Sequence, residues 1–329
     1  MPARLENEMK ITNSIEDMLK GMPTYVVEWH NNLHAGKKTA ATRRDFIRKV
    51  HRFLTFIDTD VSKVTCDDIT SSRVTQYYIS ISTKQNADGS LSETSVSYQQ
   101  NIYTALKNFL GFLEKKGYIE SNYIEEIDRP KGDDLERINE HRIKLDKRDF
   151  KRVLHKAAME RDPVYRYRDG AILNILMSTG MRETALRIIN ISDIDFQKQT
   201  LVTIDKGSNN GKYQIYPLND ETIKVIKKWL EYRKCFEKYP SDALFLNYQG
   251  ERISCKGISR IVDKYFTQAL GRHVSPHKIR GGVISILYEE TGNIEFVRRA
   301  IGQSKVETTQ RYIKTKDDER AQAIKILSF

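Results

Sequence analysis

The chain has 329 residues, more than one domain usually holds, and its 55 lysines and arginines outnumber its 44 acidic residues. The net charge of +11 favours a polyanionic partner such as nucleic acid. Three cysteines in no CxxC pair and the lack of a long apolar run exclude a disulfide framework, a cysteine zinc site, a signal peptide and a membrane span. We therefore expect two domains in a cytoplasmic protein.

The N-terminal third predicts a short extension and then a helical domain. Residues 1–20 are polar and read as an extension that ends at Gly21. Over residues 21–128 apolar side chains recur at the 3.6-residue period of a helix, and the segment 86–90 is a turn or loop between helices. The clearest apolar stripes are Phe46, Ile47, Val50, Phe53, Leu54 and Ile57, and Tyr98, Ile102, Leu106, Phe109, Leu110 and Leu113. They predict the core of a small helical bundle.

A linker separates this bundle from a second domain. Residues 129–142 contain almost no apolar side chains, so burial cannot order them and we expect an exposed linker. In the second domain, residues 143–316, two alternating apolar segments predict a β-hairpin around residues 207–212. Helices are expected at 165–178, 222–232, 256–269 and 277–290. The predicted fold class is mainly α, with a small β-hairpin in a mixed α/β second domain.

The second domain also carries residues that phosphoryl-transfer chemistry uses: Arg182, Lys206, His277, Arg280, Gln303 and Tyr312. Taken singly, each is more ordinarily a solvated or core residue, and the HxxR motif alone is a weak signal. Together they form a much stronger signal, because they occur in a fixed order with matching separations. The segments STGMRETALRIINISDIDF, DKG, SPHKIRGG and IGQSKVETTQRYIKT resemble, in order and spacing, the signature boxes of the tyrosine recombinase, or phage integrase, family.

The resemblance assigns each residue a role in a reaction that needs neither ATP nor a metal. Arg182 and Arg280 would clamp the phosphate, because a planar guanidinium grips two oxygens and stays charged. His277 would donate to a phosphate oxygen and help to deprotonate the tyrosine, and Lys206 would protonate the departing 5′ oxygen. Tyr312 would attack phosphorus and form a 3′-phosphotyrosine, which splits one difficult exchange into two easier steps.

Two positions depart from the family pattern. The family usually has a carboxylate three residues after its first arginine, where this chain has Ala185, and Glu183 would point elsewhere on a helix. The family usually has histidine or tryptophan nine residues before its tyrosine, where this chain has Gln303. The amide of Gln303 still donates a hydrogen bond but carries no charge. These changes predict a slower reaction and leave the nucleophile and the main cations in place.

The resemblance also implies that the two domains clamp double-stranded DNA. Arg43, Arg44 and Lys107 in the helical domain and Lys212 in the hairpin are candidate DNA contacts, with a merely solvated helix face as the alternative for the first three. Most such contacts reach phosphate and position the protein without reading sequence.

The C-terminal residues 317–329 predict a short helix with Ala321, Ile324 and Leu327 on one face. So short a helix needs a surface to bury that face. In the family such a tail commonly docks on a neighbouring subunit, which implies a homotetramer on paired DNA sites and a monomer or dimer otherwise. Docking on its own subunit is the alternative.

Several functions share this chemistry. A site-specific recombinase of the simple transposon, Xer-like or inversion type is favoured, because residues 1–20 are too few for a separate arm-binding domain. Such an enzyme would serve integration, excision, transposition, inversion or resolution of DNA. A type IB topoisomerase and a DNA-binding protein without catalysis remain alternatives. Ala185 and Gln303 favour the latter, and Tyr312 opposes it.

Overall fold

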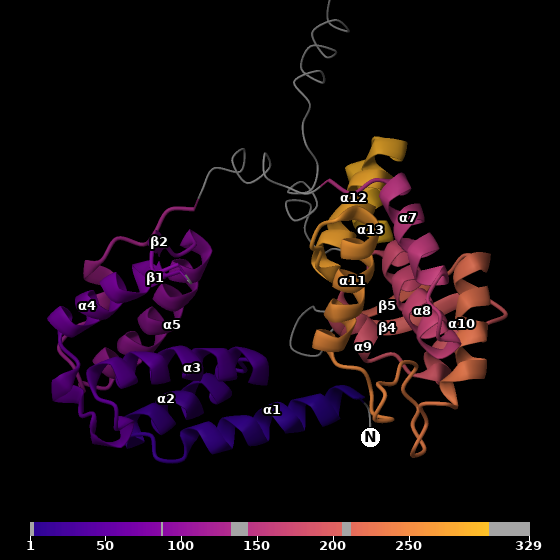
Figure 1. Ribbon diagram of the computed structural model, residues 1–329. Coiled ribbons are helices and arrows are strands. Elements are labelled where there is room, and N and C mark those ends of the chain that lie inside the picture. Colours follow the sequence, from indigo (N-terminus) through magenta and orange to yellow (C-terminus); the bar gives the residue numbers. More distant parts are fainter. Residues whose placement is uncertain (1–2, 87, 133–143, 206–211, 303–329) are drawn as a thin grey trace, which may run out of the picture. The chain divides into compact units, whose positions relative to one another are not determined.

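The computed structural model describes residues 3–86, 88–132, 144–205 and 212–302 (Figure 1). The chain divides into two compact units, Met1–Arg137 and Ile138–Phe329. The division falls within the segment 129–142, which contains few apolar side chains. In the described part of the chain, no helix combines the length and the apolar character needed to cross a membrane.

The first unit is a bundle of helices around an aromatic core. Its helices are α1 (Ala3–Leu19), α2 (Thr24–Ala35), α3 (Ala40–Ile57), α4 (Ser71–Ser82) and α5 (Val96–Lys115), with short 3-10 turns at Val61–Lys63, Cys66–Asp68 and Tyr123–Glu126. The indole of Trp29 on α2 stacks on Phe46 of α3, with 6.4 Å between ring centroids. It packs edge to face with Phe109 on α5, with 5.0 Å between ring centroids. Phe53 and Phe109 are fully buried, so the two predicted stripes do form the core.

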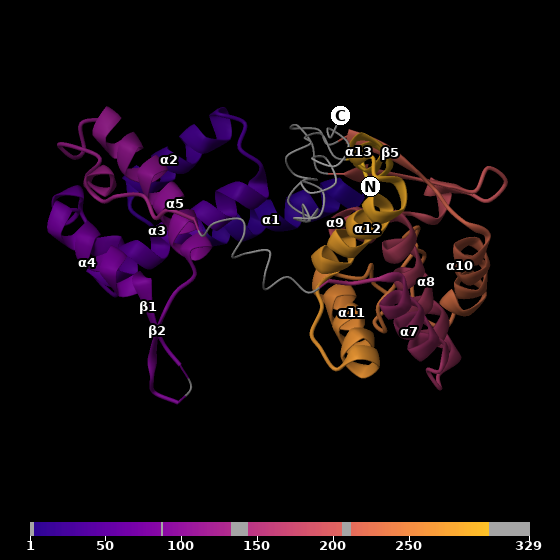
Figure 2. The same ribbon diagram turned by 90° about the horizontal axis from the view of Figure 1, so that it is seen from above.

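Two parts of this unit differ from expectation. The segment expected as an extension forms helix α1, and Ile15 is 1% exposed because α1 packs on α3. The segment 86–90 is the turn of a hairpin whose strands, β1 (Thr83–Gln85) and β2 (Leu91–Glu93), were not predicted. These strands are short and mostly polar, so no apolar alternation reveals them. Figure 2 shows the hairpin projecting from its unit.

The second unit packs helices around one small sheet. Its helices are α7 (Lys147–Ala158), α8 (Pro163–Thr179), α9 (Glu183–Arg187), α10 (Asp220–Arg233), α11 (Cys255–Leu270), α12 (Pro276–Thr291) and α13 (Ile294–Ala300). Strands β3 (Ile194–Asp195), β4 (Thr200–Asp205) and β5 (Lys212–Pro217) form an antiparallel sheet in the order β3-β4-β5, with a 3-10 turn at Ile191–Asp193 before β3. The four predicted helices and the predicted hairpin of β4 and β5 are confirmed. Helices α7 and α9 and strand β3 were not predicted.

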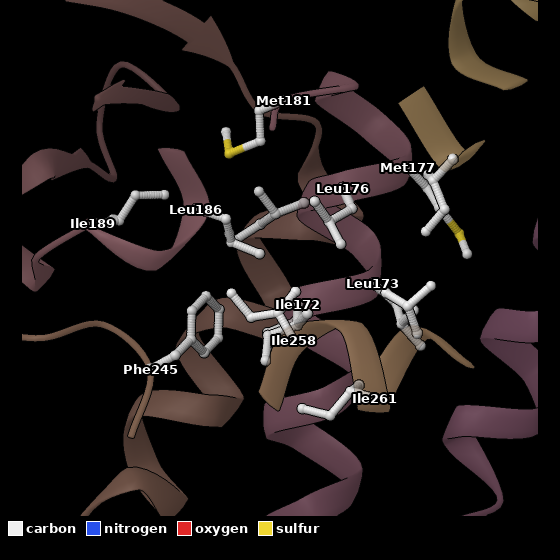
Figure 3. Close-up of a cluster of buried hydrophobic side chains, with 14 of the residues drawn as sticks. Ile172, Leu173, Leu176, Met177, Met181, Leu186, Ile189, Phe245, Ile258 and Ile261 are labelled. Atoms are coloured by element: carbon white, nitrogen blue, oxygen red, sulfur yellow. The ribbon is translucent and has the colours of Figure 1, made fainter. Parts of the chain in front are cut away.

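Helix α8 is the centre of the second unit. Most of its length is buried because α7, α10 and α12 pack against it, and Ile172 and Leu176 are fully buried. Figure 3 shows Met181, just after α8, and Leu186 of α9 pointing into the same cluster. The turn that joins α8 to α9 is therefore anchored in the core on both sides.

A polar network supports α8 from its other end. The buried Asp169 carboxylate pairs with Arg168 at 2.8 Å and accepts a hydrogen bond from the Tyr265 hydroxyl at 3.1 Å. Burial raises the pKa of Asp169, and Arg168 and the tyrosine hydroxyl oppose that shift. The network ties α8 to α11, which carries Tyr265, and so fixes the helix that leads to Arg182.

Candidate active site

Arg182 lies at the start of α9, immediately after a tight turn. Helix α8 ends at Thr179, and Gly180 adopts φ 61°, a left-handed conformation that favours glycine. The Thr179 hydroxyl donates to the Ile175 carbonyl and accepts from the amide of Met181 at 3.2 Å. Met181 is 1% exposed. The turn is thus held by hydrogen bonds and by the core, and it presents the half-buried Arg182 as the N-cap residue of α9.

His277 and Arg280 lie one turn apart on α12 but in different surroundings. His277 is exposed in the first turn of the helix, after Pro276. Arg280 is 1% exposed. Its Nη1 donates to the Gly180 carbonyl at 2.6 Å, and its Nη2 donates to the Ile301 carbonyl at 3.1 Å. Arg280 therefore joins α12 to the turn before Arg182 and to the residue that follows α13.

The other predicted catalytic residues, Lys206, Gln303 and Tyr312, lie outside the described residues, as does the tail 317–329. The described elements lead directly to two of them. Strand β4 ends at Asp205, next to Lys206 in the sequence, and the described chain ends at Gly302, next to Gln303.

Ala185 lies where α9 packs against the sheet. Ala185 is 1% exposed, and its carbonyl accepts a hydrogen bond from the Thr203 hydroxyl of β4 at 3.0 Å. The Glu183 carboxylate accepts a hydrogen bond from the Ser259 hydroxyl of α11 at 2.8 Å. Helix α9 is thus tied to both β4 and α11. Within the described ranges, no group of three or more histidine, cysteine, aspartate or glutamate side chains is placed to hold a metal ion.

Arg43, a candidate DNA contact, does not lie on an open face of its helix. Arg43 is 6% exposed, and its Nη1 lies 3.0 Å from His30 Nε2 and 2.8 Å from His34 Nδ1, both on α2. Arg43 is four residues before the buried Ile47, so it falls on the face of α3 that α2 covers. The guanidinium holds the two helices together.

A different set of arginines forms the exposed basic face of α3. Arg44 is half-buried, and Arg48 and Arg52, four and eight residues later, are exposed. The Arg52 guanidinium donates to the Tyr98 hydroxyl in the first turn of α5. Sequence reasoning missed Arg48 and Arg52, although their four-residue spacing from Arg44 was visible. We name Arg44, Arg48 and Arg52 the α3 arginine stripe.

Lys107, the remaining DNA-contact candidate in the first unit, is exposed on α5 and pairs with Glu125 at 2.8 Å. That partner offsets part of its charge. Lys212 begins β5, and its side chain lies outside the described part of the structure.

The Arg43 cluster predicts a pH-dependent stability of the first unit. Burial, and then the charges of Arg43 and His34, lower the pKa of His30. Below the ordinary histidine pKa of about 6.5, the unfolded chain binds a proton that native His30 resists, so the free energy of unfolding should fall as the pH falls. The two tryptophans lie one in each unit, so Trp29 fluorescence in a Trp229→Phe background reports on this unit.

Urea unfolding at about pH 7.5 and about pH 5.5, on either side of that pKa, measures the effect. His30→Gln removes the titrating ring and keeps a side-chain acceptor for Arg43, so it should depend less on pH than the parent. An equal dependence in both proteins would assign the effect to other groups.

Known proteins resemble this chain in sequence and in fold. The model of the phage integrase family matches residues 144–319. The tyrosine recombinase XerC of Psychromonas ingrahamii is 30% identical over 210 residues, which cover 64% of this chain and 67% of that protein. The XerC of Caldanaerobacter subterraneus subsp. tengcongensis is 29% identical over 281 residues, which cover 84% and 74%.

Two solved structures share the fold. The XerH site-specific recombinase bound to its difH substrate before cleavage matches with a TM-score of 0.64 at 17% identity, over 91% of this chain and 84% of that one. The Tn1549 transposon integrase in complex with a circular intermediate DNA matches with a TM-score of 0.64 at 17% identity, over 93% and 99%. These matches confirm the mainly helical fold class. The family model covers more than half of the chain and spans every box from Arg182 to Tyr312, and the chain therefore belongs to the phage integrase family, the family of the tyrosine recombinases.

Proposed function

We propose that this protein cleaves and rejoins DNA at specific sites through a covalent 3′-phosphotyrosine on Tyr312. The observation that carries the proposal is the family match over residues 144–319, which includes the nucleophile and every proposed cation of the second unit. Support comes from the rigid turn at Arg182 and from Arg280, which bonds to that same turn.

In the first step the Tyr312 oxygen attacks phosphorus and the bond to the 5′ oxygen breaks. Negative charge grows on the non-bridging oxygens, and preorganised cations stabilise it where it develops. Arg182 and Arg280 supply the compensating positive charge, Arg280 from its buried place against the Gly180 and Ile301 carbonyls. His277 donates a hydrogen bond to a phosphate oxygen. Gln303 adds a neutral donor.

Protons move in a balanced way. Lys206 gives a proton to the departing 5′ oxygen. The proton of Tyr312 passes to the unprotonated ring nitrogen of His277, whose other nitrogen donates to the phosphate. A 5′ hydroxyl of the exchange partner then attacks the phosphotyrosine and reverses the sequence. The energy of the phosphodiester bond is conserved in the covalent link, so rejoining needs no nucleotide.

The first unit binds the duplex beside the cleavage site. The α3 arginine stripe is the exposed basic face that suits a phosphate backbone, because each neutralised phosphate releases counterions. Lys212 on the hairpin of the second unit adds a further contact. Arg43 is left out of this proposed surface, because it lies between α2 and α3 and its Nη1 contacts His30 and His34.

The proposal is tested by trapping the intermediate. Binding sites are first selected from the DNA that flanks the gene, and a duplex with a nick close to the cleavage point is then made from them. Loss of the short 5′ fragment prevents rejoining, so a protein–DNA adduct that survives denaturation should accumulate. Sites that are bound tightly but never yield an adduct would favour a DNA-binding protein without catalysis.

We further propose that the tail 317–329 couples subunits in a tetramer on paired sites. Burying Ile324 and Leu327 contributes about 1.5–3 kcal/mol each, so the tail needs a receiving groove. Deletion of residues 318–329 should weaken assembly on paired sites far more than binding to a single half-site. Gel-shift titrations on half-site and full-site DNA, followed by a strand-exchange assay, measure both effects. Equal losses on the two DNAs would mean that the tail packs within its own subunit.

A further inference from the structure

The hairpin of β4 and β5 contacts the turn that precedes Gln303. The contact is made by Gln214, a residue that has no role in the reaction as proposed above. Gln214 of β5 lies with its side-chain amide against the backbone of Gly302. A β-carbon added at Gly302 would lie 2.6 Å from Gln214 Oε1 and 2.7 Å from its Cδ, closer than real contacts of this kind.

Gly302 meets two demands at once. Its φ of 66° is left-handed, which any side chain would strain, and the Gln214 amide fills the place of a side chain. The carbonyl of the preceding residue, Ile301, accepts the hydrogen bond from Arg280. Arg280 of α12 therefore holds this short turn by a hydrogen bond, and the side chain of Gln214 on β5 lies against it.

The contact closes a ring of interactions through the second unit. Gln214 is paired across the sheet with Thr203, whose hydroxyl donates to the carbonyl of Ala185 on α9. Helix α9 begins at the turn after Gly180, whose carbonyl binds Arg280, and Arg280 binds Ile301 beside Gly302. The ring thus connects four elements: α9, whose N-cap is Arg182, α12, which carries the HxxR motif, the β4–β5 hairpin, and the turn at Gly302.

We propose that Gln214 is a positioning residue for DNA cleavage, which acts by setting the backbone of Gly302 relative to the β4–β5 hairpin. It does not itself touch the phosphate. In the sequence Lys206 follows β4 and Gln303 follows Gly302, so we expect a shift at this contact to reach both residues. The inference rests on the proposed function, because it assigns Gln214 a part in that reaction.

Loss of the Gln214 contact should slow the reaction strongly, because the reaction tolerates little displacement of its catalytic groups. Catalytic groups about 1 Å out of place cost on the order of 10²-fold in rate. Gln214→Ala removes the amide from an outer strand without opening the core, because Gln214 is only half-buried. We expect the rate of adduct formation to fall about 10-fold or more, with the half-site dissociation constant and the melting temperature close to those of the parent.

Ile215→Ala is the matched control. Ile215 is the next residue on β5, faces the other side of the strand and is 62% exposed. It should cleave at the parent rate. A merely structural role for Gln214 would lower the melting temperature and the DNA affinity together with the rate, and that result would overturn the proposal.

A second pair of variants tests the contact itself. Gly302→Ala should be slowed by backbone strain and by displacement of the Gln214 amide. In the Gln214→Ala background the amide is already gone, so the same change should cost a clearly smaller factor. Equal factors in the two backgrounds would show that Gln214 and Gly302 act independently, and would overturn the inference.

The two levels of the proposal fail in different ways. If the parent protein forms no adduct on any selected site, the proposed function fails. If the parent forms the adduct and Gln214→Ala forms it at the same rate, the proposed function stands and the role of Gln214 is refuted.

Discussion

Tyr312→Phe should abolish the covalent protein–DNA adduct and leave the affinity for DNA nearly unchanged. The change removes one oxygen, the atom that attacks phosphorus, and keeps the ring. No other side chain in the closing box, IGQSKVETTQRYIKT, can replace a phenolate as the nucleophile with the same spacing from Gln303. The expected loss is complete, because the covalent intermediate has no other route of formation.

The measurement uses the nicked duplex and a denaturing gel, with a filter-binding titration on the same DNA. Tyr239→Phe is the matched control, because Tyr239 is a 72% exposed tyrosine of the same unit far from the boxes in sequence. It should form adduct at the parent rate. An adduct that persists in the Tyr312→Phe variant would place the nucleophile elsewhere.

Lys206→Ala should slow cleavage by about 10²–10⁴-fold, the range for loss of a general acid. Without a proton donor the 5′ oxygen departs as an alkoxide, a poor leaving group. A substrate with sulfur at the 5′-bridging position has a leaving group that needs no proton. That substrate should restore most of the rate to the variant and change the parent little.

Lys198→Ala is the control for general loss of positive charge. Lys198 is exposed between β3 and β4 and pairs with Asp195 at 3.6 Å. The Lys198→Ala variant should cleave both substrates at the parent rate. If the bridging sulfur restores none of the rate lost in Lys206→Ala, Lys206 stabilises charge or positions DNA and another group is the acid.

Much of the fold was predictable because it follows from local pattern. Helices α5, α8 and α11 bury the apolar stripes that the 3.6-residue period predicts, and β4 and β5 show the alternation of strands. Helix α1 was missed because a mostly polar segment gains its stability from packing on α3, which no local pattern records. Strands β1 and β2 were missed because each has only three residues and the single apolar one, Leu91, gives no alternation.

The candidate residues of the site could be named from the sequence, because the order and spacing of Arg182, the HxxR motif and Tyr312 require no knowledge of packing. The same holds for the family and for the basic charge that suits DNA. These are properties of residue type and of separation along the chain.

Only the tertiary structure decided which charged side chains are available to a ligand. Arg43 and Arg44 are neighbours in the sequence, yet α2 covers the first and leaves the second on the arginine stripe. Arg280 is buried against two carbonyls and Gln214 lies on Gly302 because segments far apart in the chain meet there. The periodicity of apolar residues predicts that a helix has two faces. Only the elements that pack on the helix determine which charged side chains remain exposed.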